Sequence, residues 1–203
     1  MLKKAALVLA TLAVADPAFA HHVMGGRQAA TFGEGLLSGL GHPVIGLDHF
    51  AAVVAIGCLA AAHRSGPALV IGYIAAMVLG VGAHLMGASV PAAELLVALT
   101  VFALGFVLLL DRGMSAGAAL TAFALTGLIH GYALGESIYG AERTPLVAYL
   151  IGLAIIQSAI SLVAMLIARA MLRRADVVTL RLVGAGIAGI GIAIIVGQLT
   201  PSV

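Results

Sequence analysis

The amino-acid sequence predicts an all-α membrane protein with about six transmembrane helices in one bundle, preceded by a cleavable signal peptide. Of its 203 residues, 63% are hydrophobic and 9% are charged, and the mean hydropathy of +1.19 is far outside the range of soluble domains. The apolar residues form segments long enough to cross a hydrocarbon core about 30 Å thick. Basic residues follow a pattern that predicts an N-out, C-out topology.

Residues 1–20 have the parts of a signal peptide. Lys3 and Lys4 form a basic start, an apolar stretch covers 5–15, and the sequence AFA at 18–20 is a small-x-small cleavage site. The alternative is an uncleaved anchor helix, but the apolar stretch is short and an Asp-Pro pair interrupts it. We therefore expect the mature chain to begin at residue 21.

Residues 21–44 are predicted to be a periplasmic N-terminal segment that contains a short interfacial helix. The stretch TFGEGLLSGLG places Phe32, Leu36, Leu37 and Leu40 on one helical face. A helix with one apolar face and few charges is expected to lie along the outer leaflet.

Residues 45–203 are predicted to form a single six-helix transmembrane domain. Each apolar segment has spanning length, and turn-forming residues separate the segments. In the last segment, glycine and alanine recur at small-x-x-x-small spacing, which allows close contact between helices. The expected spans are Ile45–Ala62, Ala68–Met86, Pro91–Leu110, Ala116–Leu134, Leu146–Met171 and Leu180–Leu199.

The direction of the spans follows from two independent signals. Cleavage of a signal peptide would leave the new N-terminus outside, so the first, third and fifth connections would face the cytoplasm. Cytoplasmic ends of bacterial membrane helices are rich in basic residues. The predicted inner ends carry Arg64, Arg112, Arg169, Arg173, Arg174 and Arg181, whereas Arg27 and Arg143 are predicted to lie outside.

Two observations exclude other classes of protein. Cys58 is the single cysteine, so the chain has neither a disulfide framework nor a cysteine metal cluster. A net charge of +2 without a basic patch gives no reason to expect a nucleic-acid partner.

With the topology assigned, seven ionisable residues are predicted to lie near the outer face of the membrane. Histidines and carboxylates near the hydrocarbon are costly, so they are candidates for function. Neutral imidazoles with carboxylates and no thiolate suit a divalent ion such as nickel, cobalt or zinc. The candidate metal ligands are His42, Asp48, His49, His84, Glu94, His130 and Glu136.

The spacing of His42 and His49 constrains how they bind an ion. On a continuous helix, seven residues separate them by about 10.5 Å, which is too far for one ion. Either a turn at Gly41-His42-Pro43 folds back over the helix end, or the two histidines act at successive stations. A path with several stations suits a permease, because the ion must leave as easily as it enters.

Two stretches of the sequence resemble each other. SGLGHPVIGLDH and TGLIHGYALGES align without gaps, which pairs His42 with His130 and Asp48 with Glu136. Elsewhere, Gln157 and Ser158 are polar residues at the middle of the fifth span, where they either line a path or bond across helices. His21 and His22 would stand at the mature N-terminus and could capture metal there.

The stretch HPVIGLDH, residues 42–49, resembles the His-Pro-x-x-Gly-x-Asp-His signature of the HupE/UreJ family. HGYALGESIYGAE, residues 130–142, is similar to a second motif of that family, in which members often carry a further histidine where this chain has Leu134. The resemblance implies a six-span permease that supplies nickel or cobalt. It implicates His42, Asp48 and His49 from the first motif, and His130 with Glu136 from the second.

The leading hypothesis is therefore a multi-pass permease of the bacterial inner membrane that takes up Ni²⁺ or Co²⁺ and is not an enzyme. It needs no prosthetic group, and without a P-loop it is expected to be a secondary transporter. Beyond the metal ion and the bilayer, a homo-oligomer and downstream metallochaperones remain open as partners. The alternatives are an intramembrane zinc hydrolase, which would need three metal ligands and an activating carboxylate, and a periplasmic accessory protein that binds metal without transport.

Overall fold

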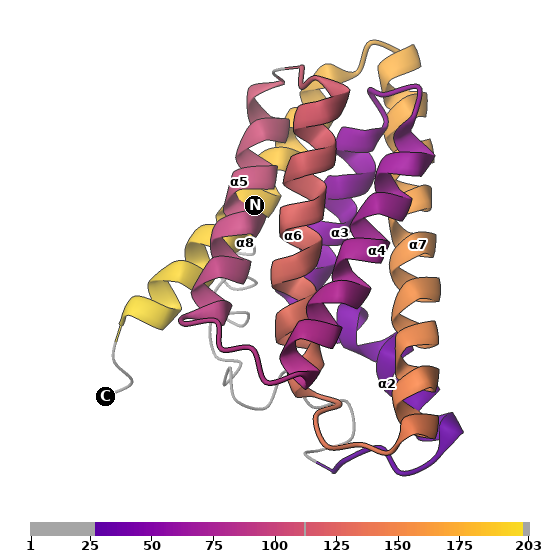
Figure 1. The fold of residues 1–203 in the computed structure, drawn as a ribbon. Helices are drawn as coiled ribbons and strands as arrows, with labels where there is room; N and C mark the ends of the chain where they lie inside the picture. Colours follow the sequence, from indigo (N-terminus) through magenta and orange to yellow (C-terminus); the bar gives the residue numbers. More distant parts are fainter. Residues whose placement is uncertain (1–26, 112, 201–203) are drawn as a thin grey trace, which may run out of the picture.

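The computed structural model describes residues 27–111 and 113–200, and within these ranges all regular structure is helical (Figure 1). The predicted signal peptide, His21 and His22 lie outside the described residues. The helices, in chain order, are α2 (Phe32–Ile45), α3 (Leu47–Ala60), α4 (Gly66–Leu85), α5 (Ala93–Leu110), α6 (Ala116–Glu136), α7 (Arg143–Arg173) and α8 (Val177–Leu199).

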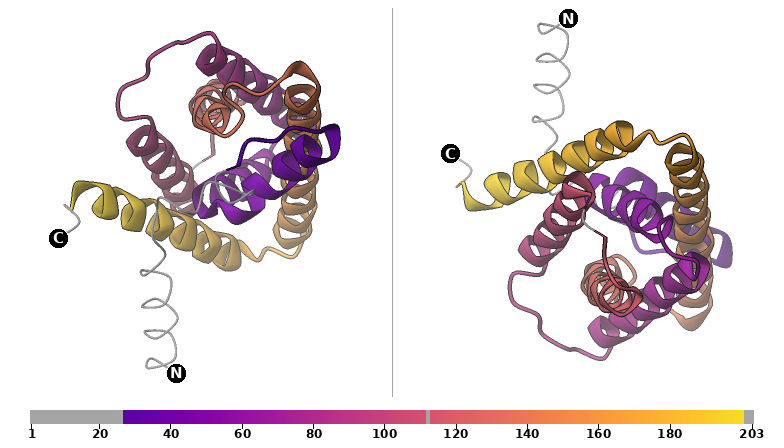
Figure 2. Two further views of the ribbon diagram at one scale, coloured as in Figure 1. Left: turned by 90° about the horizontal axis from the view of Figure 1, so that it is seen from below. Right: turned by 90° about the horizontal axis from the view of Figure 1, so that it is seen from above.

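The long helices pack around α3, which contacts each of the other described helices (Figure 2). Five helices, α4 to α8, are each long and apolar enough to cross a membrane. The fully buried side chains of Ile56, Tyr73 and Phe123 belong to the main hydrophobic core, between α3, α4 and α6. The protein is therefore a helical bundle with several candidate membrane spans, as the sequence predicts.

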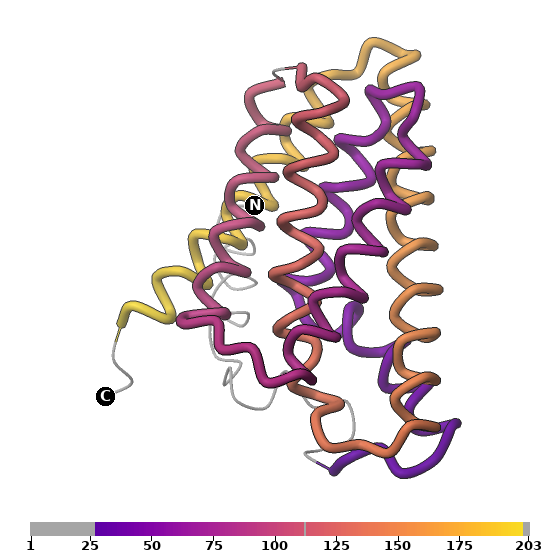
Figure 3. The backbone as a smooth tube through the Cα atoms, in the orientation of Figure 1, coloured from indigo at the N-terminus to yellow at the C-terminus, as the bar shows by residue number. Residues whose placement is uncertain are grey.

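The first span differs from the straight helix expected over Ile45–Ala62. α3 has 14 residues and is about 21 Å long, which is too short to cross the hydrocarbon core alone. It qualifies as a sixth span only together with α2, and the two helices are bent by 78° at their junction (Figure 3). The bent pair therefore has the length and composition of a broken span or of a re-entrant loop.

Gly46 lies at the break, where it ends α2 and begins α3 in an extended conformation. Its N–H donates to the carbonyl oxygen of His42 at 2.9 Å, and its own carbonyl accepts from Phe50 at 2.9 Å. Pro43, inside the last turn of α2, has no N–H to offer a helix ladder. The backbone groups at the bend are thus satisfied although the helix axis changes direction.

A helix is present where the interfacial helix is predicted, as α2, and its small residues form the buried face. Gly35, Ser38 and Gly39 are buried against α7, whereas Phe32 and Leu37 are 49% and 63% exposed. A Cβ atom on either glycine would overlap a backbone carbonyl of α7, so only glycine permits this approach. Phe32 and Leu37 therefore lie on the exposed face of α2.

Glycine also sets two other close helix pairs. On α6, Gly127 and Gly131 lie against the backbone of α4, and on α8, Gly184 and Gly191 lie against the backbone of α5. Close contact through small residues in the last span, which its spacing predicts, is thereby confirmed.

The two ends of the bundle differ in character. We call the histidine end the one where α3, α5 and α7 begin and α4 and α6 end. The opposite end, which we call the arginine end, holds the connections after α3, α5 and α7 (Figure 1). At the arginine end, Arg169 donates to the carbonyl of His63 at 3.1 Å, and Arg181 donates to that of Leu109 at 3.0 Å. Basic side chains there cap exposed helix carbonyls.

Candidate functional site

Three buried histidines from three helices meet at the histidine end. His42 on α2 is 3% exposed, His49 on α3 is 2% exposed and His130 on α6 is fully buried. The ring centroids of His42 and His49 are 5.6 Å apart, and those of His49 and His130 are 5.0 Å apart. We call these three residues the histidine cluster.

The bend at Gly46 brings His42 beside His49. A continuous helix would separate the two residues by about 10.5 Å along its axis, whereas their ring centroids lie 5.6 Å apart. Of the two alternatives left open by the spacing, the structure has a fold-back. It occurs at Gly46, three residues after the predicted turn at Gly41-His42-Pro43.

Thr100 on α5 holds His130 from the side opposite His49. Its hydroxyl donates to the carbonyl of Val97 at 2.7 Å and lies 2.9 Å from Nε2 of His130. A hydroxyl has one proton, so in the arrangement where Thr100 donates to Val97 it accepts from the His130 Nε2–H. Nδ1 of neutral His130 then carries the lone pair.

This assignment extends to His49. Nδ1 of His49 lies 2.9 Å from Nδ1 of His130, so the His49 nitrogen must be the donor of that hydrogen bond. Nε2 of neutral His49 is then the nitrogen with a lone pair for a cation. Metal-binding histidines usually donate their other N–H to an acceptor that fixes the ring, and His130 and Thr100 provide such a support for His49.

Asp48 supplies a buried carboxylate beside the cluster. It is 6% exposed, and its Oδ1 accepts from the backbone N–H of His49 at 2.7 Å. It lies in the first turn of α3, where the helix dipole favours negative charge. A carboxylate in this position would offset the charge of a cation bound where water is scarce.

Sequence reasoning missed two hydroxyl groups of the site. Ser137, next to the end of α6, lies with its Oγ 3.1 Å from Nδ1 of His42. A threonine within a span is expected to bond to its own helix, and Thr100 does so through the carbonyl of Val97. Its second contact, with His130, depends on how α5 packs against α6. Neither residue has a signal in the sequence that distinguishes it from other serines and threonines in spans.

None of the other predicted ligands that the structure describes is buried as the cluster residues are. The ring of His84 contacts those of Tyr132 and Tyr139, with centroids at 4.7 and 5.7 Å. Glu94 is exposed in the first turn of α5, and Glu136 is exposed at the end of α6. The two similar sequence stretches therefore place equivalent histidines in the cluster, but Asp48 is buried where Glu136 is exposed.

Across residues 27–111 and 113–200, no three His, Cys, Asp or Glu side chains are arranged to hold one metal ion together. The cluster's imidazoles instead bond to each other and to hydroxyl groups.

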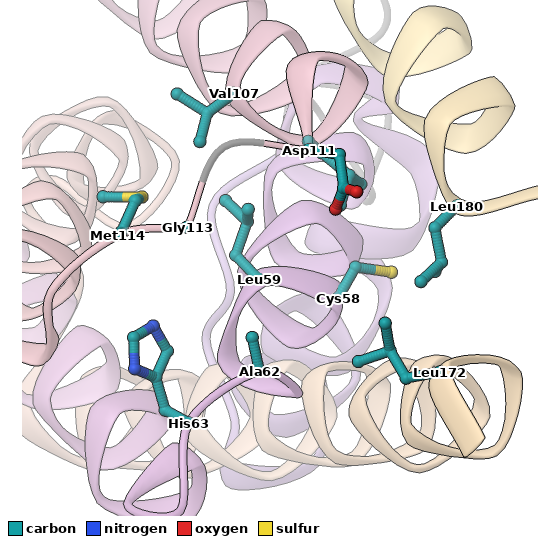
Figure 4. Close-up of a pocket in the computed structure, with 11 residues that line it drawn as sticks. Cys58, Leu59, Ala62, His63, Val107, Asp111, Gly113, Met114, Leu172 and Leu180 are labelled. Atoms are coloured by element: carbon teal, nitrogen blue, oxygen red, sulfur yellow. The ribbon is translucent and has the colours of Figure 1, made fainter. Parts of the chain in front are cut away.

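A cavity of about 70 Å³ opens at the arginine end, between the ends of α3 and α5 (Figure 4). Its lining includes Cys58, His63, Asp111 and Met114 among apolar residues. In Figure 4 the His63 ring lies on the far side of the cavity from Cys58 and Asp111. These four side chains therefore line a cavity without converging on one point.

The fold and the cluster together define a class: a helical membrane protein with imidazole and carboxylate groups buried at one end of its bundle. The chain belongs to the HupE/UreJ family, because the family model described as HupE / UreJ protein matches residues 9–194. It is 27% identical over 187 residues to Protein HupE of Rhizobium leguminosarum bv. viciae, a match that covers 91% of this chain and 94% of that protein. No solved structure matches the chain.

Proposed function

We propose that this protein is a permease of the bacterial inner membrane that takes up Ni²⁺ or Co²⁺. The HupE/UreJ family is generally associated with transport of these metals, and the chain belongs to it. The observation that carries the proposal is the histidine cluster, since three buried imidazoles from three membrane helices are costly unless they serve a function.

In this proposal the metal ion is the cargo, and His49 is its first protein ligand. Nε2 of His49 replaces one coordinated water, Asp48 offsets the charge, and the imidazole of His42 lies beside His49 on the other side of the bend. Imidazole with carboxylate suits nickel and cobalt, although affinity alone would favour copper. Selectivity must therefore come from geometry and from the waters that the ion retains.

The histidine end is proposed to face the periplasm, with His21 and His22 capturing metal ahead of it. The arginines at the opposite end support this orientation, because cytoplasmic ends of membrane helices are enriched in basic residues. The sequence contains no P-loop, so we propose secondary transport rather than ATP-driven transport.

The test is uptake of labelled nickel and cobalt by a bacterial strain that lacks its own importers of both metals. Expression of the wild-type protein should raise uptake of one or both ions. His49→Ala should lower that uptake about 10-fold or more, in line with the loss of a metal ligand. His63→Ala is the matched control, because His63 lies at the arginine end and its backbone carbonyl carries its hydrogen bond.

Four outcomes would contradict the proposal. Uptake no faster than in cells with an empty vector would exclude a permease for these ions, and full activity of His49→Ala would exclude the site. Reconstituted liposomes that bind metal on the surface without filling would indicate an accessory protein. Bound zinc together with turnover of a lipid or peptide would indicate a hydrolase.

A further inference from the structure

A second polar pair lies inside the bundle, where α4 meets α7. The hydroxyl of Tyr73 donates to Oε1 of Gln157 at 2.6 Å, and both side chains are fully buried. Nε2 of Gln157 has no hydrogen-bond partner among the residues that the structure describes. The amide thus presents one of its two polar groups to the interior without a partner.

The pair lies about one helical turn, roughly 5 Å, further into the membrane than the histidine cluster. On α4, the backbone of Tyr73 contacts Gly127, which is three residues closer to the arginine end than His130. The pair and the cluster therefore occupy successive levels of the same bundle.

A buried amide group without a hydrogen-bond partner lowers the stability of the folded protein. Leaving a buried donor unsatisfied costs about 1–3 kcal/mol, and few native groups are left in that state. Turning the amide of Gln157 by half a revolution would let Nε2 donate to the Tyr73 hydroxyl oxygen, but Oε1 would then lack a partner. Either orientation leaves one polar group that a water molecule, or water bound to an ion, can satisfy.

We propose that Tyr73 and Gln157 form an inner station for the hydrated cation, which Gln157 contacts through water bound to the metal. The inference rests on the proposed transport of Ni²⁺ or Co²⁺. The amide, turned so that Oε1 points away from Tyr73, accepts from the ion's water shell. A neutral amide binds such an ion more weakly than a carboxylate, which suits a stop from which the ion must depart.

The same pair lies before a largely apolar layer, in which the hydroxyl of Ser161 is satisfied by the carbonyl of Val53. Ile56 and Phe123 follow on α3 and α6 toward the arginine end, and both are fully buried in the main core. An apolar layer of this kind blocks ions until the helices move. The station would hold the ion at that barrier.

Access of water to Gln157 gives a test that does not depend on transport. Cys58 is the one native cysteine, so Cys58→Ala provides a background for single cysteines read out with a small, water-soluble thiosulfonate reagent. Gln157→Cys should react, and Ni²⁺ or Co²⁺ should slow the reaction. Ile155→Cys is the matched control, because Ile155 is at nearly the same depth of α7 but is 55% exposed on the outer surface of the bundle. Since the thiolate forms only in contact with water, the control should react at least about 10-fold more slowly.

The result would overturn the station if Gln157→Cys reacted no faster than Ile155→Cys, or if neither metal changed its rate. The reaction separates the two proposals. If metal slowed the reaction of Gln157→Cys but the protein took up no metal, the inner station would be supported and the permease proposal contradicted. If Gln157→Cys did not react although the wild-type protein takes up metal, only the inner station would be contradicted.

Kinetics supply a second test, in which each value is normalised to folded protein. Gln157→Met keeps the length of the side chain and removes its polar groups, whereas Gln157→Glu keeps acceptors of the same size. If the station acts after entry, Gln157→Met should lower the maximal uptake rate about 10-fold and change the apparent KM less than about twofold. Gln157→Glu should retain transport with an altered ratio of nickel to cobalt uptake. Wild-type rates and ratio in both variants would show that the pair is only structural.

Discussion

The hydroxyl of Thr100 determines the tautomers of two histidines that lie beyond it. When the Thr100 hydroxyl donates to the carbonyl of Val97, its oxygen accepts from Nε2–H of His130. Nδ1 of His130 in turn accepts from Nδ1–H of His49. The lone pair of His49 is thereby placed on Nε2. Thr100 and His130 are positioning residues in this arrangement, and His49 is the proposed ligand.

Replacing Thr100 tests that chain of hydrogen bonds. Thr100→Val keeps the shape of the side chain but removes the acceptor for His130, so the apparent affinity for nickel or cobalt should fall about 10-fold to 100-fold. Thr100→Ser should restore it, because serine keeps the hydroxyl. The measurement is the KM for uptake together with metal binding by the purified protein.

Thr121→Val is the control for this substitution, since Thr121 is an exposed threonine on α6. If Thr100→Val bound and transported metal as the wild type does, the tautomers would not matter and His49 would not be oriented from α5.

The sequence predicted which types of residue form the cluster, but it did not predict which of the candidate residues belong to it. Four of the predicted ligands, His42, Asp48, His49 and His130, are buried together or adjacent, and their cost near lipid made them visible. Glu94 and Glu136 were equally conspicuous as charges, but both are exposed. Charge indicates that a residue needs water or a partner, and only packing decides whether its side chain is buried.

The junction of α2 and α3 is the element on which the site depends. Gly46 occupies it, and a Cβ atom there would lie 3.0 Å from Cδ2 of His49 and 3.1 Å from Oδ1 of Asp48. Such contacts are tight, but they involve side chains that can move. A methyl group at this position should therefore disturb the site more than the fold.

We expect Gly46→Ala to lower metal uptake severalfold, to roughly a fifth of the wild-type rate, by displacing His49 from its geometry. Protein amount and thermal unfolding in detergent should change little. Normal uptake by this variant would mean that the positions of His49 and Asp48 beside the bend are unimportant.

The contact between α4 and α6 should respond in the opposite way. A Cβ atom on Gly131 would overlap the backbone carbonyl of Met77, and backbone cannot move aside without separating the helices. Gly131→Ala should therefore destabilise the protein by about 1–3 kcal/mol or more, as overpacking does. A lower midpoint of thermal unfolding would show it.

Gly82→Ala serves as the control for Gly131→Ala, because Gly82 lies on α4 and nothing lies within 4 Å of the Cβ atom it would gain. Equal stability of the two variants would contradict the close approach of α4 and α6.

The bundle as a unit has two chemically different ends, and its orientation in the membrane can be measured. Ser89, exposed between α4 and α5, lies at the histidine end, and Ser65, exposed before α4, lies at the arginine end. In the Cys58→Ala background, a membrane-impermeant thiol reagent should label Ser89→Cys in intact cells. It should label Ser65→Cys only after the membrane is opened. The reverse pattern would invert the proposed topology.

The apolar surface of the bundle agrees with this membrane setting. Large hydrophobic side chains are exposed on every long helix, among them Ile71, Leu79, Leu166 and Leu182, each more than half exposed. Soluble proteins rarely expose apolar surface of this extent, but a bilayer covers it. The core between the helices is correspondingly narrow and relies on glycine contacts.

Membrane class, the approximate spans and the short helix before them follow from composition and local pattern, because the thickness of a bilayer and the period of a helix act along the chain. The same local information exposes costly histidines such as His49. It contains no distances between helices. Tertiary packing alone decided that the predicted first span bends at Gly46, that Thr100 and Ser137 reach the imidazoles, and that His84 contacts tyrosines. Those contacts depend on how closely glycine lets one backbone approach another.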